Sequence, residues 1–142
     1  MENSISKDYY WEMSHRLPFH KGLCKNIHGH SYKLRISLYG TLNENKMILD
    51  FYDLNQILNP LINKLDHSFI CDDNDNLMYD FLHNNGFKYI KISGFTTVEN
   101  LLDYIISEII DEFKKIENIK KMKIRIYETI DAFAEKEVVI SL

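Results

Sequence analysis

Residues 30 to 39, HSYKLRISLY, alternate regularly between apolar or aromatic side chains and polar or charged ones. Successive side chains of a β-strand point to opposite faces, so this segment is predicted to be a strand with one buried face. Such a strand is stable only within a sheet whose apolar face is covered. The side chains predicted to share the buried face are His30, Tyr32, Leu34, Ile36 and Leu38.

Other segments show the same alternation. Residues 8 to 16 place Trp11, Met13 and His15 on one face, and residues 121 to 128 do the same for Met122, Ile124, Ile126 and Glu128. Further strands are predicted over residues 47 to 51, after a hairpin turn, over 87 to 93, and over about 134 to 141.

Three helices are predicted between these groups of strands. The longest has apolar residues at helical spacing from Leu101 to Phe113, and Thr96 to Glu99 fits a capping box at its start. A second helix is predicted to begin near Asp53 and to kink or break at Pro60.

The third helix is shorter, running from Asp75 to about Asn84 and closed by Gly86. The order of strands, helices and strands predicts an α+β fold, with an antiparallel sheet covered by helices on one face. A chain of 142 residues, 45% of them hydrophobic, fits a single domain over residues 1 to 142.

Charge and cysteine content exclude several classes of protein. The net charge of -4 gives no electrostatic reason to expect nucleic acid or an anionic membrane as partner. Two cysteines without a C-x-x-C pair fit a reducing compartment. The first residues do not resemble a signal peptide, and no apolar stretch has the length of a membrane span, so a cytoplasmic protein is expected.

Three histidines are placed to share a metal ion. His28 and His30 are two residues apart and point the same way on an extended chain. His15 ends the preceding strand with the same inward parity, and a hairpin over residues 16 to 28 would bring it beside them. Three imidazoles from neighbouring strands predict an open Zn²⁺ site with a fourth position for water or substrate. The alternative is that they are core histidines bonded to backbone.

Cys24 lies in the loop just before these histidines. A thiol beside a metal ion can act as base or nucleophile, or it can be a fourth ligand that closes the site. The only other cysteine, Cys71, has no comparable neighbours and is interpreted as structural.

Two carboxylates are further candidates. Adjacent Asp66 and His67 can couple a carboxylate to an imidazole and tune a base, although such a pair after a helix is often only a loop feature. Glu128 is the one charge in an inward-facing row and could bind a flat heterocycle through an amino group and a ring N–H. The alternative places Glu128 beyond the strand end, in water.

Six short motifs, in this order, resemble one family: WEMSHRLP, CKNIHGHSY, LDFYDL, LDH, TTVEN and YET. They are similar to motifs of the 6-pyruvoyltetrahydropterin and 6-carboxytetrahydropterin synthases, and the resemblance spans residues 8 to 140. It implies the tunnelling fold, a homo-oligomeric barrel, commonly a hexamer, with active sites between subunits, and 7,8-dihydroneopterin triphosphate as substrate.

The resemblance also implies roles for residues. Zinc would be bound by His15, His28 and His30, and Cys24 would be the general base. Asp66 and His67 would assist from a neighbouring subunit. The pterin ring would be bound by Glu128, Thr97 and Glu99.

The three-residue gap between Cys24 and His28 resembles the bacterial 6-carboxytetrahydropterin synthases. That branch is a lyase that releases acetaldehyde and triphosphate on the way to queuosine. The alternatives are a 6-pyruvoyltetrahydropterin synthase and a non-catalytic zinc-binding or pterin-binding protein. Relative to compact members the segment from Asp66 to Glu99 is longer, which could reshape a subunit interface.

Overall fold

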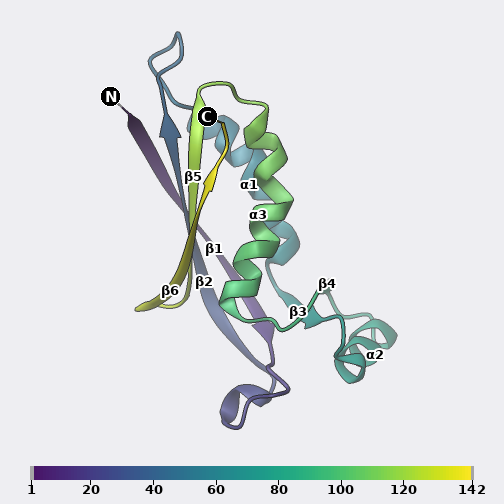
Figure 1. Cartoon of the computed structure of the whole chain (residues 1–142). Helices are drawn as coiled ribbons and strands as arrows, with labels where there is room; N and C mark the ends of the chain where they lie inside the picture. Colours follow the sequence, from purple (N-terminus) through teal and green to yellow (C-terminus); the bar gives the residue numbers. More distant parts are fainter. Residues whose placement is uncertain (1, 142) are drawn as a thin grey trace.

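The computed structural model describes residues 2 to 141, so the predicted domain limits, 1 and 142, lie outside the described residues. Over this range the chain forms a six-stranded sheet in the order β4-β3-β1-β2-β5-β6. Figure 1 shows the long strands twisting together, with α1 and α3 on one side of them and α2 near β3 and β4.

The centre of the sheet is the hairpin of β1 (Asn3–His15) and β2 (His28–Gly40). These strands pair in antiparallel fashion along their whole length, from Asn3 opposite Gly40 to His15 opposite His28. β2 in turn pairs with β5 (Ile119–Thr129), and β5 with β6 (Ala132–Val139). The predicted hairpin over residues 16 to 28 is therefore confirmed, and it contains the short 3-10 helix η1 (Leu23–Lys25).

The sequence pattern predicted an antiparallel sheet, but the sheet is mixed. β3 (Ser68–Asp72) was not predicted, and it runs parallel to both β1 and β4 (Tyr89–Ile92). All five residues of β3 are buried, so its sequence does not alternate between polar and apolar positions. A strand covered on both faces lacks the period-two signal from which strands are recognised.

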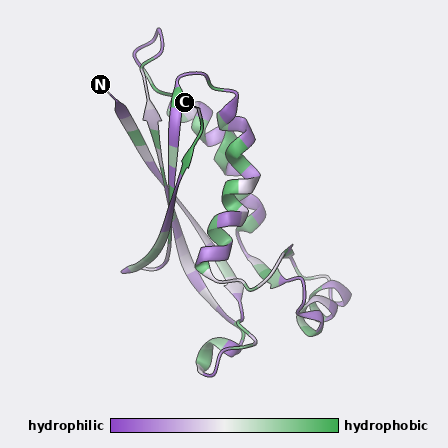
Figure 2. Cartoon of the chain, in the orientation of Figure 1, coloured by the Kyte–Doolittle hydropathy of each residue, from purple (hydrophilic) through white to green (hydrophobic). Residues whose placement is uncertain are grey.

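Two helices cover one face of the sheet: α1 (Phe51–Leu65) and α3 (Val98–Lys114). Figure 2 shows hydrophobic and hydrophilic residues alternating around the turns of α3, as expected for a helix with one buried side. Phe113 of α3 and Leu58 of α1 are completely buried against the apolar side of the strands. Burial of side chains of this size contributes about 1.5–3 kcal/mol each, so this layer stabilises the sheet that carries the site.

Four sequence predictions around these helices are wrong in detail. No strand forms over residues 47 to 51, because Asp50 already accepts a hydrogen bond from the Tyr52 N–H and begins α1. The cap is therefore Asp50 and not Asp53, and α1 continues through Pro60 without a break. The cap of α3 is Thr97, whose hydroxyl accepts from the Asn100 N–H, and not the predicted Thr96.

α2 (Asn76–Asn84) confirms the predicted short helix, with Asp75 as its N-cap. Gly86 follows it at φ +73°, a left-handed conformation that glycine adopts without strain. Met78 and Leu82 of this helix pack against Phe69 and Cys71 of β3 and form a small second cluster. Cys71 is completely buried there, in agreement with its interpretation as structural.

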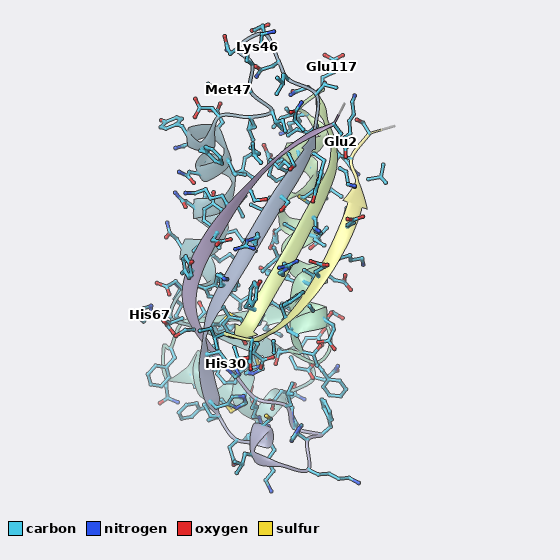
Figure 3. All side chains as sticks on the ribbon, turned by 90° about the vertical axis from the view of Figure 1, so that its left-hand side faces the viewer. Glu2, His30, Lys46, Met47, His67 and Glu117 are labelled. Carbon is cyan, nitrogen blue, oxygen red and sulfur yellow. The ribbon has the colours of Figure 1, made fainter. Side chains whose placement is uncertain are left out.

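The other face of the sheet is polar and carries ion pairs such as Arg35 with Asp8, 2.8 Å from Nε to Oδ1. Figure 3 views the molecule from this face and shows His30 and His67 in its lower half, away from Lys46 and Glu117 at the top. None of the helices within residues 2 to 141 is long and apolar enough to cross a membrane.

Candidate metal centre and active site

His15, His28, His30 and Glu128 form a cluster at one end of the sheet. Their nearest ligand atoms all lie within 4.8 Å of one another. The two strands of the central hairpin bring the histidines together, since His15 pairs directly with His28 and the next pair on that face is Met13 with His30. The predicted convergence of the three imidazoles is thus present in the fold.

The imidazoles are oriented for a metal ion. The Nδ1 atoms of His15 and His28 lie 2.8 Å from the main-chain oxygens of Thr96 and Asn26, so each Nδ1–H donates to a carbonyl. This leaves the lone pair on Nε2. The three Nε2 atoms are buried and have no hydrogen-bond partner within the described chain. Buried nitrogens without partners are costly, and a cation shared among them removes that cost.

Glu128 belongs to the same cluster. Its Oε1 lies 2.8 Å from His30 Nε2 and 3.5 Å from His15 Nε2, although neither contact has hydrogen-bond geometry. Glu128 sits where the pairing of β5 with β6 shifts register, between Tyr127 and Thr129. Such bulges redirect side chains, so Glu128 is held within the strand and turned toward the histidines, not placed beyond the strand end.

The electrostatics of Glu128 follow from this position. Contact with His15 is the main cause that keeps the pKa of its carboxyl below the usual value, with the charges of His30 and His28 adding to it and burial opposing. Burial in turn lowers the pKa of the His30 imidazole. The two shifts favour a Glu128 carboxylate beside a neutral His30 imidazole, which are the protonation states in which these two side chains bind metal ions.

Cys24 lies outside the ligand cluster. The group of potential metal ligands found within residues 2 to 141 does not include its sulfur. Cys24 is half-buried in η1, where its main-chain oxygen accepts a hydrogen bond of 2.8 Å from the Leu17 N–H. This bond ties the two ends of the loop together. The four potential ligands that do lie together are His15, His28, His30 and Glu128.

Asp66 and His67 form the predicted pair, with His67 Nδ1 3.0 Å from Asp66 Oδ2. The Glu12 N–H also donates to Asp66 Oδ1 at 2.8 Å. That backbone hydrogen bond is the main reason that the pKa of Asp66 is lowered, and His67 adds to it. The His67 side chain is 77% exposed and its φ is +60°, so the backbone presents this imidazole to solvent.

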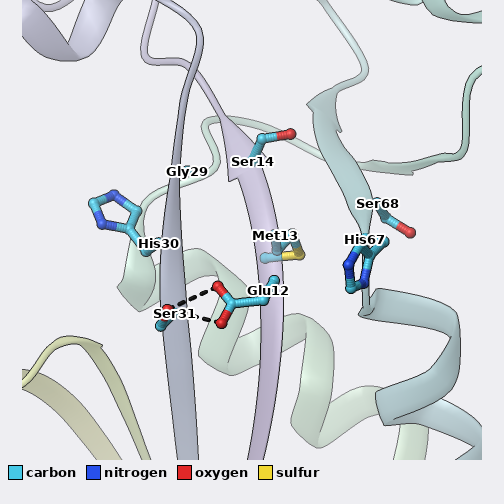
Figure 4. A pocket seen from close by; sticks show the side chains of 8 residues that line it. All are labelled: Glu12, Met13, Ser14, Gly29, His30, Ser31, His67 and Ser68. Carbon is cyan, nitrogen blue, oxygen red and sulfur yellow. Dashed lines mark hydrogen bonds between the residues drawn. The ribbon is translucent and has the colours of Figure 1, made fainter.

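Two cavities open beside His30. One of about 360 Å³ extends from His30 to His67 across β1 and β2. Figure 4 shows these two side chains on opposite sides of it, and between them the Ser31 hydroxyl donates a hydrogen bond to the Glu12 carboxylate. The other, of about 590 Å³, is lined by Glu128 as well as His30. Its remaining lining residues are Tyr10, Gly29, Ser31, Lys33, Tyr127, Thr129 and Ile130.

Thr97 and Glu99 lie at the start of α3. The Thr97 hydroxyl caps α3, and Glu99 is exposed in the first turn of that helix. Neither makes a hydrogen bond or ion pair with the four clustered side chains in the described structure. Sequence reasoning also missed that Glu128 lies within ligand distance of the histidines, because the bulge that turns it has no clear sequence signal.

Comparison with known proteins agrees with this geometry. The family model for 6-pyruvoyl tetrahydropterin synthase matches residues 4 to 138. The chain belongs to this family. Over 92% of the chain it is 32% identical to a Haemophilus influenzae protein named 6-carboxy-5,6,7,8-tetrahydropterin synthase, covering 96% of that protein. An Aquifex aeolicus protein of the same name is also 32% identical, with 95% of this chain and 98% of that protein covered.

Solved structures show the fold. The 6-pyruvoyl tetrahydropterin synthase of Plasmodium vivax superposes with a TM-score of 0.78 at 18% identity, over 98% of this chain and 99% of that one. The tunnelling fold predicted from the motifs is therefore confirmed. The protein is an enzyme similar to the 6-carboxytetrahydropterin synthases, as the motifs indicated.

Proposed function

We propose that this protein is a zinc-dependent 6-carboxy-5,6,7,8-tetrahydropterin synthase. It would convert 7,8-dihydroneopterin triphosphate to the 6-carboxy product with release of acetaldehyde and triphosphate, a step toward queuosine. The observation that carries the proposal is the cluster of three unpartnered Nε2 atoms, to which Cys24 does not belong. A site of this kind could hold a metal ion with one coordination position left open, and a separate thiol would lie on the neighbouring loop.

His15, His28 and His30 would hold the zinc. Three neutral imidazoles with a free position are typical of catalytic zinc, whereas structural zinc has four protein ligands. When bound, zinc would polarise oxygens of the substrate side chain and so acidify the carbon between them. The two main-chain carbonyls that accept from His15 and His28 keep both rings in the ligating tautomer.

Cys24 would act as the base at the substrate side chain. It lies on the loop that immediately precedes His28, so the thiol and the ligands belong to one continuous segment. A base at this position would take a proton from the carbon next to the bound oxygens. The Leu17–Cys24 hydrogen bond restricts the loop and limits where the sulfur can move.

Glu128 would bind the ring of the substrate in the larger cavity. Its carboxylate can accept from an amino group and a ring N–H side by side. Thr97 and Glu99 would add contacts only if the start of α3 approaches the ligand. Asp66 and His67 would assist proton transfer, because Asp66 fixes the orientation of an imidazole that is otherwise exposed.

We also propose that the active enzyme is a homo-oligomer, a hexamer closed as a barrel with sites between subunits, in the cytoplasm. β6 forms one edge of the sheet, and on the other side β3 pairs only with Met13 and Ser14 of β1. Most of the outer edge of β1 is therefore free within the described chain. Two long free edges favour pairing between copies, which would also bring exposed His67 to a neighbour's site.

Product analysis tests the proposed reaction. The zinc-loaded protein is incubated with 7,8-dihydroneopterin triphosphate, and the pterin is identified by mass spectrometry, with the Cys24→Ala variant as control. A carboxytetrahydropterin together with acetaldehyde supports the proposal. A pyruvoyl product would assign the enzyme to the other branch, and unchanged substrate with zinc bound would contradict catalysis on this substrate.

A further inference from the structure

A chain of buried polar contacts leads from His15 to α2. Buried polar side chains are few in the described structure, and three of them, His15, Thr96 and Asp75, belong to this chain. His15 Nδ1 lies 2.8 Å from the Thr96 carbonyl oxygen and 3.3 Å from its hydroxyl. The Thr96 hydroxyl donates to the carbonyl oxygen of Arg16, the residue that follows His15, at 3.3 Å.

Arg16 continues the chain to α2. Its Nε and Nη2 donate to the two carboxylate oxygens of Asp75, each at 2.7 Å. The Asp75 side chain is only 5% exposed, and it also caps α2 by accepting from the Met78 N–H at 3.4 Å. The bidentate pair is the main reason that the pKa of Asp75 is low. Paired, planar contacts of this kind define direction as well as distance.

These contacts restrain the end of β1, from which His15 projects. A buried ion pair adds little to stability compared with apolar residues of similar size, but it fixes where its partners point. Arg16 is the first residue after β1, so anchoring it restricts the end of the strand from which His15 projects. Thr96 restrains the same strand end by a second route, because it contacts both His15 and Arg16.

We propose that Asp75, through Arg16, and the Thr96 hydroxyl are positioning residues that hold His15 in the orientation needed to bind metal. This inference rests on the proposed metal-binding role of His15. It gives a function to the segment between Asp66 and Glu99, which carries both residues. Substitution of groups that hydrogen-bond to metal ligands typically lowers metal affinity roughly 10-fold to 100-fold.

The test uses zinc affinity and not turnover. Full-length wild type, Asp75→Asn and Thr96→Val are titrated with zinc chloride in competition with a chromophoric chelator at neutral pH. Asparagine can still cap α2, and valine preserves the shape of threonine, so each change removes mainly the contact in question. Thermal unfolding of the metal-free proteins is measured in parallel to separate affinity from stability.

Asp8→Asn is the matched control. Asp8 makes the same bidentate contact with Arg35, at 2.8 Å and 3.1 Å. It lies on β1 seven residues before His15, about 23 Å along an extended strand. If the Asp75 contact were merely structural, Asp75→Asn would lower the unfolding temperature, more than Asp8→Asn because Asp75 is the more buried, and both variants would keep wild-type zinc affinity.

The expected result is at least a 10-fold loss of zinc affinity in Asp75→Asn, a smaller loss in Thr96→Val, and none in Asp8→Asn. Wild-type affinity in a folded Asp75→Asn protein would overturn the proposal. If Asp75→Asn does not fold, wild-type affinity in Thr96→Val overturns it instead. Failure of the wild type itself to bind zinc would reject the proposed metal site, and the inference with it.

Discussion

His15 and His28 are paired directly across the β1–β2 ladder, with ring centroids 4.6 Å apart. Directly opposed residues of antiparallel strands share one face, so the register of this hairpin alone brings two imidazoles together. A shift of one residue would turn one of them to the polar face. The hairpin register therefore decides whether a metal site exists.

Replacing a ligand should remove the metal. We expect His28→Ala to lower zinc affinity more than about 100-fold, since this exceeds the effect of altering groups that only support a ligand. Inductively coupled plasma mass spectrometry of the purified protein gives the zinc content. His83→Ala is the control, because the His83 side chain is exposed on α2 and contacts the Tyr89 hydroxyl, at 3.0 Å, instead of the clustered histidines. Full zinc occupancy in His28→Ala would contradict the ligand set.

Cys24→Ala should separate catalysis from metal binding. Loss of a general base typically costs about 10²-fold to 10⁴-fold in turnover. We expect a loss of that size in Cys24→Ala at unchanged zinc content, and little change in the turnover of folded Cys71→Ala, whose thiol is buried. Loss of zinc in Cys24→Ala would instead make Cys24 a ligand.

Glu128→Gln distinguishes substrate binding from metal ligation. The change keeps the volume of the side chain and removes its charge, so we expect weaker pterin binding, measured by fluorescence titration, and retained zinc. A matched variant is Glu135→Gln, because Glu135 pairs with Arg125 on the neighbouring strand. If Glu128→Gln loses zinc as well, the carboxylate completes the coordination of the ion.

Acid should destabilise the metal-free protein partly through Asp75. Its pKa in the folded state lies below the ordinary value of 3.8, chiefly because Arg16 donates two hydrogen bonds to it. The unfolded state then binds more protons in this range, so the stabilisation is complete above pH 3.8 and is lost as pH falls through the lower folded value. Urea unfolding of Asp75→Asn at several pH values should give a shallower acid dependence than the wild type.

The helical layer can be tested by a cavity. Phe113 is completely buried between α3 and the sheet, so Phe113→Ala should lower the free energy of unfolding by about 3–5 kcal/mol. Phe81 is 50% exposed on α2, and Phe81→Ala should cost far less. Equal losses in urea unfolding would show that the two positions are buried alike.

The local sequence determined much of this fold. Alternation identified the long strands, and helical spacing identified α1 and α3, because each of these elements has one apolar and one polar side. The starts of the helices were less certain. Thr96 and Thr97 are adjacent and either can cap a helix, and only packing against His15 decides that Thr96 serves the site while Thr97 forms the cap.

β3 was missed for a related reason, since burial on both faces erases alternation. The order of motifs was enough to indicate the family, the three histidines and the thiol, because these residues lie close together along the chain or at paired strand ends. Glu128 lies 113 positions after His15, and the bulge in β5 turns it toward that histidine. Asp75, which accepts the hydrogen bonds from Arg16, lies 59 positions after it. Local patterns carry no information about such distances, so only the tertiary structure decided them.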